Sequence, residues 1–114
     1  GADAVKTSAG ALNEIPVCRV KTPGQAVKLL KESGMKILAA SEKGREVYYK
    51  QTVEGPVLLV MGSEEKGIHH EILEMSDSSV RIPLQGPVKS LNVSVATGIL
   101  LFELAKQRGI PEED

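Results

Sequence analysis

The chain of 114 residues is 41% hydrophobic and carries a formal net charge of −1, from 14 Lys and Arg against 15 Asp and Glu. This length and composition are those of one globular domain, and no apolar run reaches the roughly 18 residues of a membrane helix, so we expect a cytoplasmic protein with no membrane partner. The single cysteine, Cys18, excludes an internal disulfide and a cysteine-rich zinc site, and we expect a buried thiol.

The charge is unevenly distributed along the chain. Residues 1–50 hold nine Lys and Arg against five Asp and Glu, and residues 51–114 hold five against ten. A domain that binds nucleic acid usually shows a basic surface, so the near-neutral total weighs against a free-standing nucleic-acid clamp. Basic residues gathered on one face would still be compatible with RNA binding.

The first half of the chain predicts a strand, a helix and a second strand. Residues 15–20 form a short apolar run, and Thr22-Pro23-Gly24 then supplies the cap and first-turn proline of a helix that ends at Gly34. Residues 35–40 predict a buried strand. The helix positions expected to face the core are Ala26, Val27, Leu29 and Leu30.

The second half continues the alternation. Residues 46–50 are either a short edge strand or a loop, whereas residues 56–61 are apolar throughout, which indicates a strand buried on both faces of a parallel sheet. A short helix over 69–75, a strand over 79–84 and a terminal helix over 92–108 follow, so the fold class is α/β. The terminal-helix residues expected in the core are Val95, Ile99, Phe102 and Leu101 or Ala105.

The spacing of residues excludes two familiar motifs, a phosphate-binding loop and a zinc-protease helix. Residues 62–67 run from glycine to glycine after a strand, but no Gly-Lys-Ser/Thr follows, and two acids in the loop would repel a phosphate. His70 is followed four residues later by Glu74 where a zinc-protease helix needs a second histidine, so no metal site is expected. What remains is a set of strand-end loops over 62–67, 82–86 and 89–94, at the sheet edge where α/β proteins bind ligands.

Several groups of residues match the motifs of a known family in order and spacing. They are residues 59–64 with Gly67, residues 82–84 with Gly86, residues 90–96, and Glu103 with Gln107 and Arg108. With these residues the chain resembles the SpoU/TrmH branch of the SPOUT RNA methyltransferases, and within it the enzymes that modify ribosomal RNA guanosine. We therefore interpret residues 1–114 as the C-terminal portion of such a methyltransferase domain.

The resemblance implies an α/β-knot fold, a mostly parallel sheet with a C-terminal trefoil knot. The chain after the Ile82-Pro83 strand would pass through a loop formed earlier, and Gly86 and Pro87 would let the backbone thread closely. Ser90 and Asn92 would begin a helix inside the site. The first strand and helix of the family fold would precede Gly1.

The resemblance also implies S-adenosylmethionine as the cofactor. It would be held by backbone and apolar contacts from Val60, Gly62, Ile82, Leu84 and Leu91, because an adenine ring suits a narrow apolar slot with a few backbone hydrogen bonds. Each of these residues by itself is equally compatible with ordinary core packing.

Glu64, Ser90 and Asn92 match the polar positions of the family's active site. Glu64 has the alternative role of a turn acid, and for Ser90 a helix-capping role is as well supported as a functional one. For Asn92 we favour function, because Ser90 is expected to cap the helix and to leave Asn92 without that task.

The implied function is methylation of the ribose 2′-hydroxyl of RNA, with ribosomal RNA as the substrate, by a homodimer. The arginine with which the family activates the hydroxyl would lie ahead of Gly1, so we expect this chain alone to be inactive. Glu65 and Leu84 stand where the family commonly has glycine and methionine. The alternative is a non-catalytic, knotted dimer module that binds the cofactor or RNA.

Overall fold

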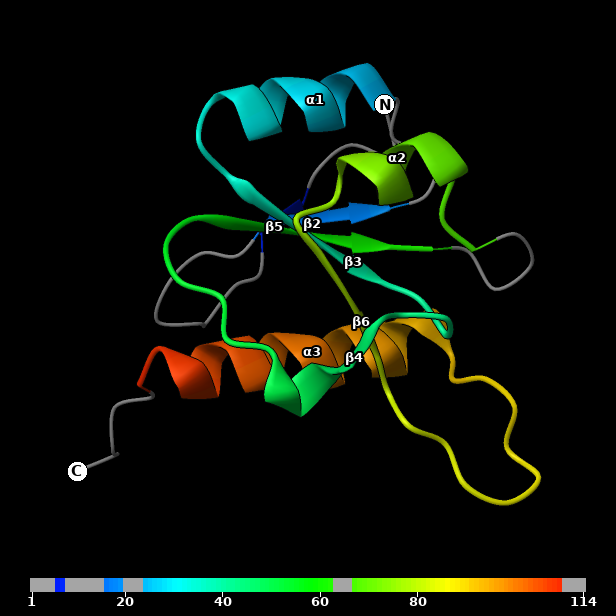
Figure 1. The fold of residues 1–114 in the computed structure, drawn as a ribbon. Helices are drawn as coiled ribbons and strands as arrows, with labels where there is room; N and C mark the ends of the chain where they lie inside the picture. Colours follow the sequence, from blue (N-terminus) through cyan, green and yellow to red (C-terminus); the bar gives the residue numbers. More distant parts are fainter. Residues whose placement is uncertain (1–5, 8–15, 20–23, 63–66, 110–114) are drawn as a thin grey trace.

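The computed structural model describes residues 6–7, 16–19, 24–62 and 67–109, and a six-stranded sheet lies at its centre. The strands lie in the spatial order β1-β2-β5-β3-β6-β4 (Figure 1). Only the β1–β2 pair is antiparallel among the described pairs, so the prediction of an α/β fold with a mostly parallel sheet is confirmed. The bounds are β1 Lys6–Thr7, β2 Pro16–Arg19, β3 Lys36–Ala40, β4 Glu46–Val47, β5 Val57–Met61 and β6 Ser78–Arg81.

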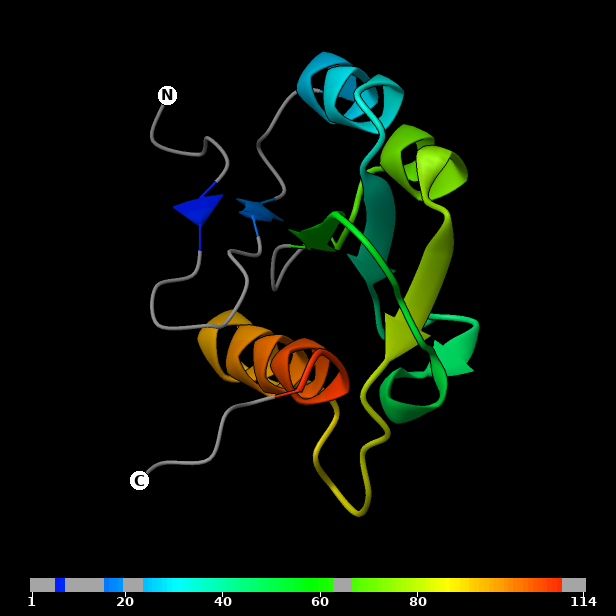
Figure 2. The same ribbon diagram turned by 90° about the vertical axis from the view of Figure 1, so that its left-hand side faces the viewer.

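Helices cover both faces of the sheet. The helices α1 (Gly24–Glu32) and α2 (His70–Met75) lie on one face, and α3 (Val93–Gln107) lies on the other with the short 3₁₀ helix η1 (Tyr48–Lys50) beside it (Figures 1 and 2). All five residues of β5 are buried, as the apolar run predicted. The ambiguous segment 46–50 contains both an edge strand and a helical turn.

The core is divided by the sheet, because successive strand residues point to opposite faces. Ile37, Ala39, Leu58 and Val60 face α1 and α2, where they pack with Val27 and Ile72. Leu38, Leu59 and Met61 face α3, where they pack with Leu100 and Leu104. Each of the fully buried aliphatic side chains stabilises the fold by about 1.5–3 kcal/mol.

The face that α3 turns toward the sheet differs from the predicted one. Leu100 and Leu104 are buried, whereas Val95 is 52% exposed and Phe102 is 68% exposed, so the prediction that these two residues face the core is wrong. The helix is apolar around most of its circumference, and two stripes satisfy the helical period. The buried stripe, with partly buried members included, consists of Val93, Ala96, Leu100, Leu101 and Leu104.

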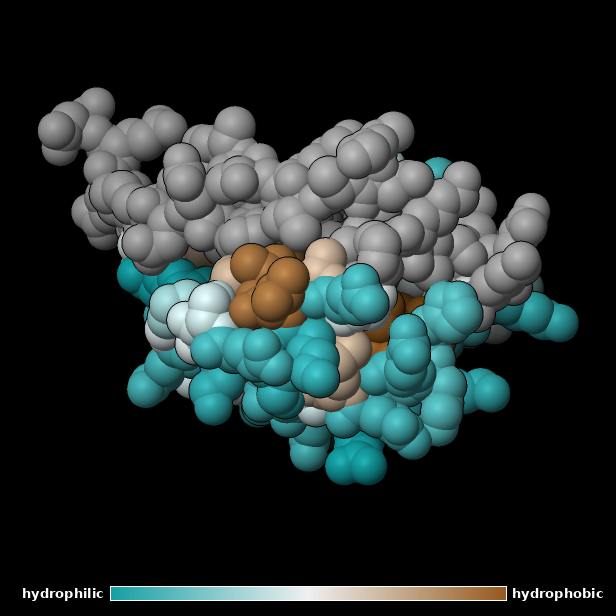
Figure 3. All heavy atoms as spheres, turned by 90° about the horizontal axis from the view of Figure 1, so that it is seen from above, coloured by the Kyte–Doolittle hydropathy of each residue, from teal (hydrophilic) through white to brown (hydrophobic). Residues whose placement is uncertain are grey.

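A similar correction applies to α1. Val27 is fully buried and Leu30 packs beside it, but Leu29 is 66% exposed. In a helix of nine residues against one side of a sheet only a narrow stripe reaches the core, and Leu29 lies outside it. Figure 3, which views this side, shows a small hydrophobic area among coloured residues that are otherwise mostly hydrophilic.

The strand β6 ends earlier than predicted. It closes at Arg81, so residues 82–84 leave the sheet. Pro83 has no N–H to donate to a neighbouring strand, which accounts for the early end. The knot expected beyond this point remains a prediction. The signal at Thr22-Pro23 and the Cys18 side chain lie outside what the structure describes.

A carboxylate at the start of β6 ties α1, β3 and β6 together. Asp77 accepts a hydrogen bond from the Ile37 N–H at 2.7 Å and pairs with the Lys31 ammonium at 3.4 Å. Burial raises the pKa of Asp77, but the Ile37 hydrogen bond and the charges of Lys31 and Lys36 outweigh it and hold that pKa below its usual value. The ionised form therefore stabilises the folded state.

We predict that Asp77→Asn lowers the free energy of unfolding at pH 7 by about 1 kcal/mol. Because the folded-state pKa is depressed, this contribution is present above the unfolded-state pKa of about 3.9 and is lost as the pH falls through the folded-state value. Urea unfolding from pH 7 to pH 3 should show the difference from wild type shrinking toward acid. Glu54→Gln, at an exposed position, is the control, and an equally destabilised control would contradict this account.

Candidate functional site

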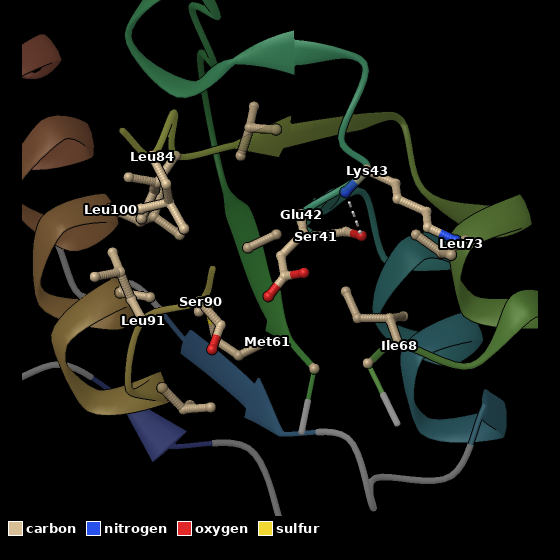
Figure 4. A pocket seen from close by; sticks show the side chains of 17 residues that line it. Ser41, Glu42, Lys43, Met61, Ile68, Leu73, Leu84, Ser90, Leu91 and Leu100 are labelled. Atoms are coloured by element: carbon tan, nitrogen blue, oxygen red, sulfur yellow. Dashed lines mark hydrogen bonds between the residues drawn. The ribbon is translucent and has the colours of Figure 1, made fainter. Parts of the chain in front are cut away.

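A cavity of about 480 Å³ lies where the carboxyl ends of β3, β5 and β6 meet. Parallel neighbours end at the same edge of a sheet, so the loops that follow these strands converge there. The start of α3 closes the cavity from the side (Figure 4). Its lining from the loops and helix includes Ser41, Glu42, Lys43, Gly62, Gly67, Ile68, Ile82, Leu84, Ser90, Leu91 and Val93.

Five of the residues singled out from the sequence line this cavity. Gly62 follows β5, Ile82 and Leu84 follow β6, and Ser90 and Leu91 precede α3. Leu84 and Leu91 lie on the side of the cavity that α3 forms, next to Leu100, and together they make an apolar wall (Figure 4). The Ser90 hydroxyl lies near Met61 at the edge of this wall.

The other three predicted site residues have different positions. The Val60 side chain is fully buried on the opposite face of the sheet, beneath α1 and α2, and its backbone lies between β2 and β3. Glu64 lies outside the described residues. Asn92 is exposed and is not part of the cavity lining.

Asn92 caps α3, which corrects the argument made for it from the sequence. The helix begins at Val93, and the Asn92 side-chain oxygen accepts a hydrogen bond from the Ser94 N–H at 2.7 Å. Ser90 lies two residues before this cap, so it does not relieve Asn92 of the capping task, and that premise was wrong. Asn92 therefore has a structural role as the cap of α3. The argument that favoured a functional role for it no longer holds.

The loop after β3 is the part of the site that the sequence reasoning missed. Ala40, Ser41, Glu42 and Lys43 all line the cavity. The signal was available, because residues 35–40 were predicted as a buried strand of a parallel sheet and its carboxyl end had to lie at the same edge. The loop carries no family-like motif, so motif spacing gives no reason to include it in the site.

Glycines allow the backbone to pack tightly in the loop after β5. A Cβ atom on Gly62 would lie 2.6 Å from the Gly67 carbonyl carbon and 2.8 Å from the Ile68 nitrogen, closer than real Cβ contacts. Gly86, in contrast, has φ +68, and no atom of the described residues comes within 4 Å of its Cβ position. Gly86 therefore supplies a positive φ, and the close threading expected at this residue stays a prediction.

The chemistry of the cavity is that of a small-molecule site. Its floor is apolar, with Met61 and Val80, and its charged lining residues within the described ranges are Glu42 and Lys43. The described residues hold no group of three or more metal-ligating side chains, and none of their helices is long and apolar enough to cross a membrane. An apolar slot with a few polar groups at one end suits a flat heteroaromatic ligand that carries a polar tail.

A profile of the SpoU rRNA Methylase family matches residues 1–102. The chain belongs to the SpoU rRNA methylase family. The resemblance seen in the motifs is thereby confirmed. The 23S rRNA (guanosine-2′-O-)-methyltransferase RlmB of Yersinia pestis is 37% identical over 107 residues, which are 94% of this chain and 44% of that protein. The chain thus spans less than half the length of this curated relative.

Solved structures of SpoU proteins share the fold. The A. aeolicus TrmH/SpoU tRNA modifying enzyme is 39% identical with a TM-score of 0.68, over 78% of this chain and 46% of that one. An AdoMet-bound rRNA methyltransferase from Sinorhizobium meliloti is 31% identical with a TM-score of 0.66, over 76% of this chain and 33% of that one. The described residues therefore have the fold of one part of these longer proteins.

We predict that Gly62→Ala destabilises the chain by about 1–3 kcal/mol, because the added methyl group overlaps backbone that cannot move without opening the loop. Gly98→Ala is the matched control. Gly98 lies in α3, with no atom of the described residues within 4 Å of its Cβ position, so alanine should stabilise the chain by up to about 1 kcal/mol. Urea unfolding measures both, and a Gly62→Ala protein as stable as wild type would contradict the packing described here.

Proposed function

We propose that residues 1–114 form the cofactor-binding C-terminal portion of an RNA 2′-O-ribose methyltransferase that uses S-adenosylmethionine and acts on ribosomal RNA. The observation that carries this proposal is the cavity at the sheet edge, which brings together the loops after β5 and β6 and the segment before α3 in a chain of the SpoU family. Ribosomal RNA as the substrate makes the cytoplasm the expected compartment.

The cofactor would bind with its adenine in the apolar part of the cavity. Ile82, Leu84 and Leu91 would contact the ring, and backbone groups at Gly62 and beside Val60 at the end of β5 would supply hydrogen bonds. The trefoil knot is proposed with this site, since the loop after β6 and the start of α3 both contribute to it. Its support is the family membership and the convergence of these segments.

The reaction is a direct displacement. The ribose 2′-oxygen attacks the methyl carbon of the sulfonium, the carbon–sulfur bond breaks, and its electron pair stays on sulfur to give S-adenosylhomocysteine. The hydroxyl proton leaves to a base, which a weakly acidic alcohol requires. Alignment of oxygen, carbon and sulfur is the other requirement, and Ser90, Asn92 and Glu64 are proposed to orient the ribose and the loops around it.

The group that activates the hydroxyl is proposed to lie ahead of Gly1. No arginine lines the cavity among the residues that the structure describes. Arg81 donates hydrogen bonds to the Gly44 and Arg45 carbonyls, and Arg108 donates to the Gly55 carbonyl, so both have structural work away from the cavity. The 114 residues by themselves are therefore expected to transfer no methyl group.

The test is a tritiated-methyl transfer assay with ribosomal RNA, on the 114 residues and on the protein with its preceding segment. We expect activity only with the longer protein, and a loss of at least roughly tenfold for Asn92→Ala and for Glu64→Gln. Because Asn92 also caps α3, Asn92→Ser is the control, since serine caps a helix nearly as well.

Methyl-transfer activity in the 114 residues would contradict the proposal that the group that activates the hydroxyl lies ahead of Gly1. An Asn92→Ser protein that is stable and fully active, beside an inactive Asn92→Ala, would show that Asn92 only caps the helix. A longer protein that binds the cofactor but modifies no RNA would favour the non-catalytic binding module over the enzyme.

The proposed assembly is a homodimer formed through the outer face of α3. Val95 and Phe102 are the large exposed apolar side chains of this helix, and Ile99 lies on the same stripe. A groove of about 450 Å³ runs beside Phe102, between Tyr48, Gly98, Ile99, Glu103 and Lys106. An exposed apolar stripe on a helix is typical of a surface that another chain covers.

We predict that Phe102→Glu shifts the protein from dimer to monomer by at least roughly tenfold in dissociation constant, because it places a charge in the apolar interface. Leu29→Glu is the matched control, since Leu29 is exposed to a similar extent on α1, on the other side of the sheet. Light scattering across a wide concentration range measures both. A wild-type monomer at every concentration, or equal effects of the two substitutions, would contradict the proposed interface.

A further inference from the structure

Glu42, on the loop between β3 and β4, has no role in the function proposed above. The loop folds back on itself directly after the strand. The Gly44 N–H donates to the Ser41 carbonyl at 2.9 Å, and the Lys43 N–H donates to the Ser41 hydroxyl at 3.1 Å. The Ser41 N–H in turn donates to the Val80 carbonyl at 3.0 Å, which joins the loop to β6.

The loop is held firmly at its far side as well. A Cβ atom on Gly44 would lie 2.2 Å from the Val80 carbonyl carbon, so the backbone of the loop lies directly on β6. The Arg81 guanidinium donates to the Gly44 carbonyl at 2.8 Å and to the Arg45 carbonyl at 3.0 Å. Because the loop is held on both sides of Glu42, the direction of the Glu42 Cα–Cβ bond is also fixed.

That direction leads into the cavity. The Glu42 carboxylate points into the space between Ser41 and Ser90, near Met61, whereas the Lys43 side chain extends toward Leu73 at the other edge (Figure 4). Leu84, Leu91 and Leu100 form the opposite wall. The cavity therefore has an apolar end and an end at which a carboxylate and a hydroxyl face the same space.

These two ends match the two parts of the proposed cofactor. With the adenine ring at the apolar end, the reacting sulfur would lie toward the end with Ser90, the polar position proposed to act on the ribose. The sulfur is a positively charged sulfonium in S-adenosylmethionine and a neutral thioether in S-adenosylhomocysteine. The ammonium and carboxylate of the methionine portion are common to both molecules, so a nearby negative charge distinguishes the two chiefly through the sulfur.

We propose that Glu42 is a specificity-determining residue whose negative charge favours the sulfonium cofactor over its neutral product. The inference rests on the proposed function, since it requires this cavity to bind S-adenosylmethionine. Glu42 is exposed, so solvent screens its charge, and its effect on the affinity ratio is roughly two- to fivefold, the size typical of an exposed ion pair. The effect lets S-adenosylmethionine compete better with the product for the site after each turnover.

The proposed role has a kinetic consequence. The positive charge on sulfur fades as the methyl group departs, so the carboxylate stabilises the bound cofactor at least as much as the transition state. Removing the charge should raise KM for S-adenosylmethionine and leave kcat unchanged or slightly higher. A residue that merely maintained the loop would lower kcat together with stability.

The experiment compares the two ligands in the full-length protein by titration calorimetry. Wild type is expected to bind S-adenosylmethionine more tightly than S-adenosylhomocysteine. Glu42→Gln is expected to raise the dissociation constant of S-adenosylmethionine by roughly two- to fivefold and to leave that of S-adenosylhomocysteine unchanged. Glu42→Lys should shift the ratio further in the same direction. Glu46→Gln is the matched control, because Glu46 is an exposed carboxylate on β4 that does not line the cavity. The wild-type preference should also decline as salt is added.

Each outcome distinguishes this inference from the function on which it rests. If wild type binds both ligands and Glu42→Gln weakens them equally, the carboxylate contacts a group they share, such as the ribose hydroxyls, and the inference is wrong. An unchanged ratio in both Glu42 variants would also overturn it, with the cofactor site intact. If folded wild type binds neither ligand, the proposed function fails and the inference fails with it.

Discussion

The parallel alignment of β5, β3 and β6 determines where the loops of this protein come together. These neighbouring strands run in the same direction in the centre of the sheet, so their carboxyl ends meet at one edge. The strands stay aligned because β5 is buried on both faces, by α1 and α2 above and by α3 below. Every loop that lines the cavity is a continuation of one of these strands, apart from the approach to α3.

Close backbone packing then turns the edge into a defined cavity. Gly62 rests on Gly67 and Ile68, and Gly44 rests on Val80, with distances that leave no room for a side chain at either glycine. Arg81 fastens the loop after β3 through two backbone carbonyls. A site assembled in this way from backbone and short loops can hold a small ligand through shape and backbone hydrogen bonds, with few polar side chains needed for binding. That agrees with the apolar character of the residues proposed to contact the adenine.

The sequence predicted the centre of the sheet well because β5 is a continuous apolar run and β3 is apolar after Lys36. Residues 57–61 could only be a strand buried on both faces, and the loops with Gly62, Ile82 and Leu91 could be placed by their order along the chain. The prediction from sequence was wrong where one local pattern is compatible with two arrangements. On α3 both the Leu100 stripe and the Phe102 stripe satisfy the helical period, and only the packed sheet selects the first. The sequence around the start of α3 favours Ser90 as the cap, whereas the structure has Asn92 there. Glu42 belongs to no motif. The predicted strand over 35–40 places the loop that follows it at this edge of the sheet, but only the folded loop shows that Glu42 lines the cavity.

Amide chemical-shift mapping with S-adenosylhomocysteine determines whether this edge of the sheet binds the cofactor. The stable product avoids the slow decay of the sulfonium, and the backbone amides report contact wherever the ligand binds. We expect chemical-shift changes that saturate together at Ser41, Gly67, Ile82 and Leu91, the amides around the cavity. Shifts confined to Tyr48, Gly98 and Phe102 beside the outer groove of α3, with the cavity amides unchanged, would contradict it.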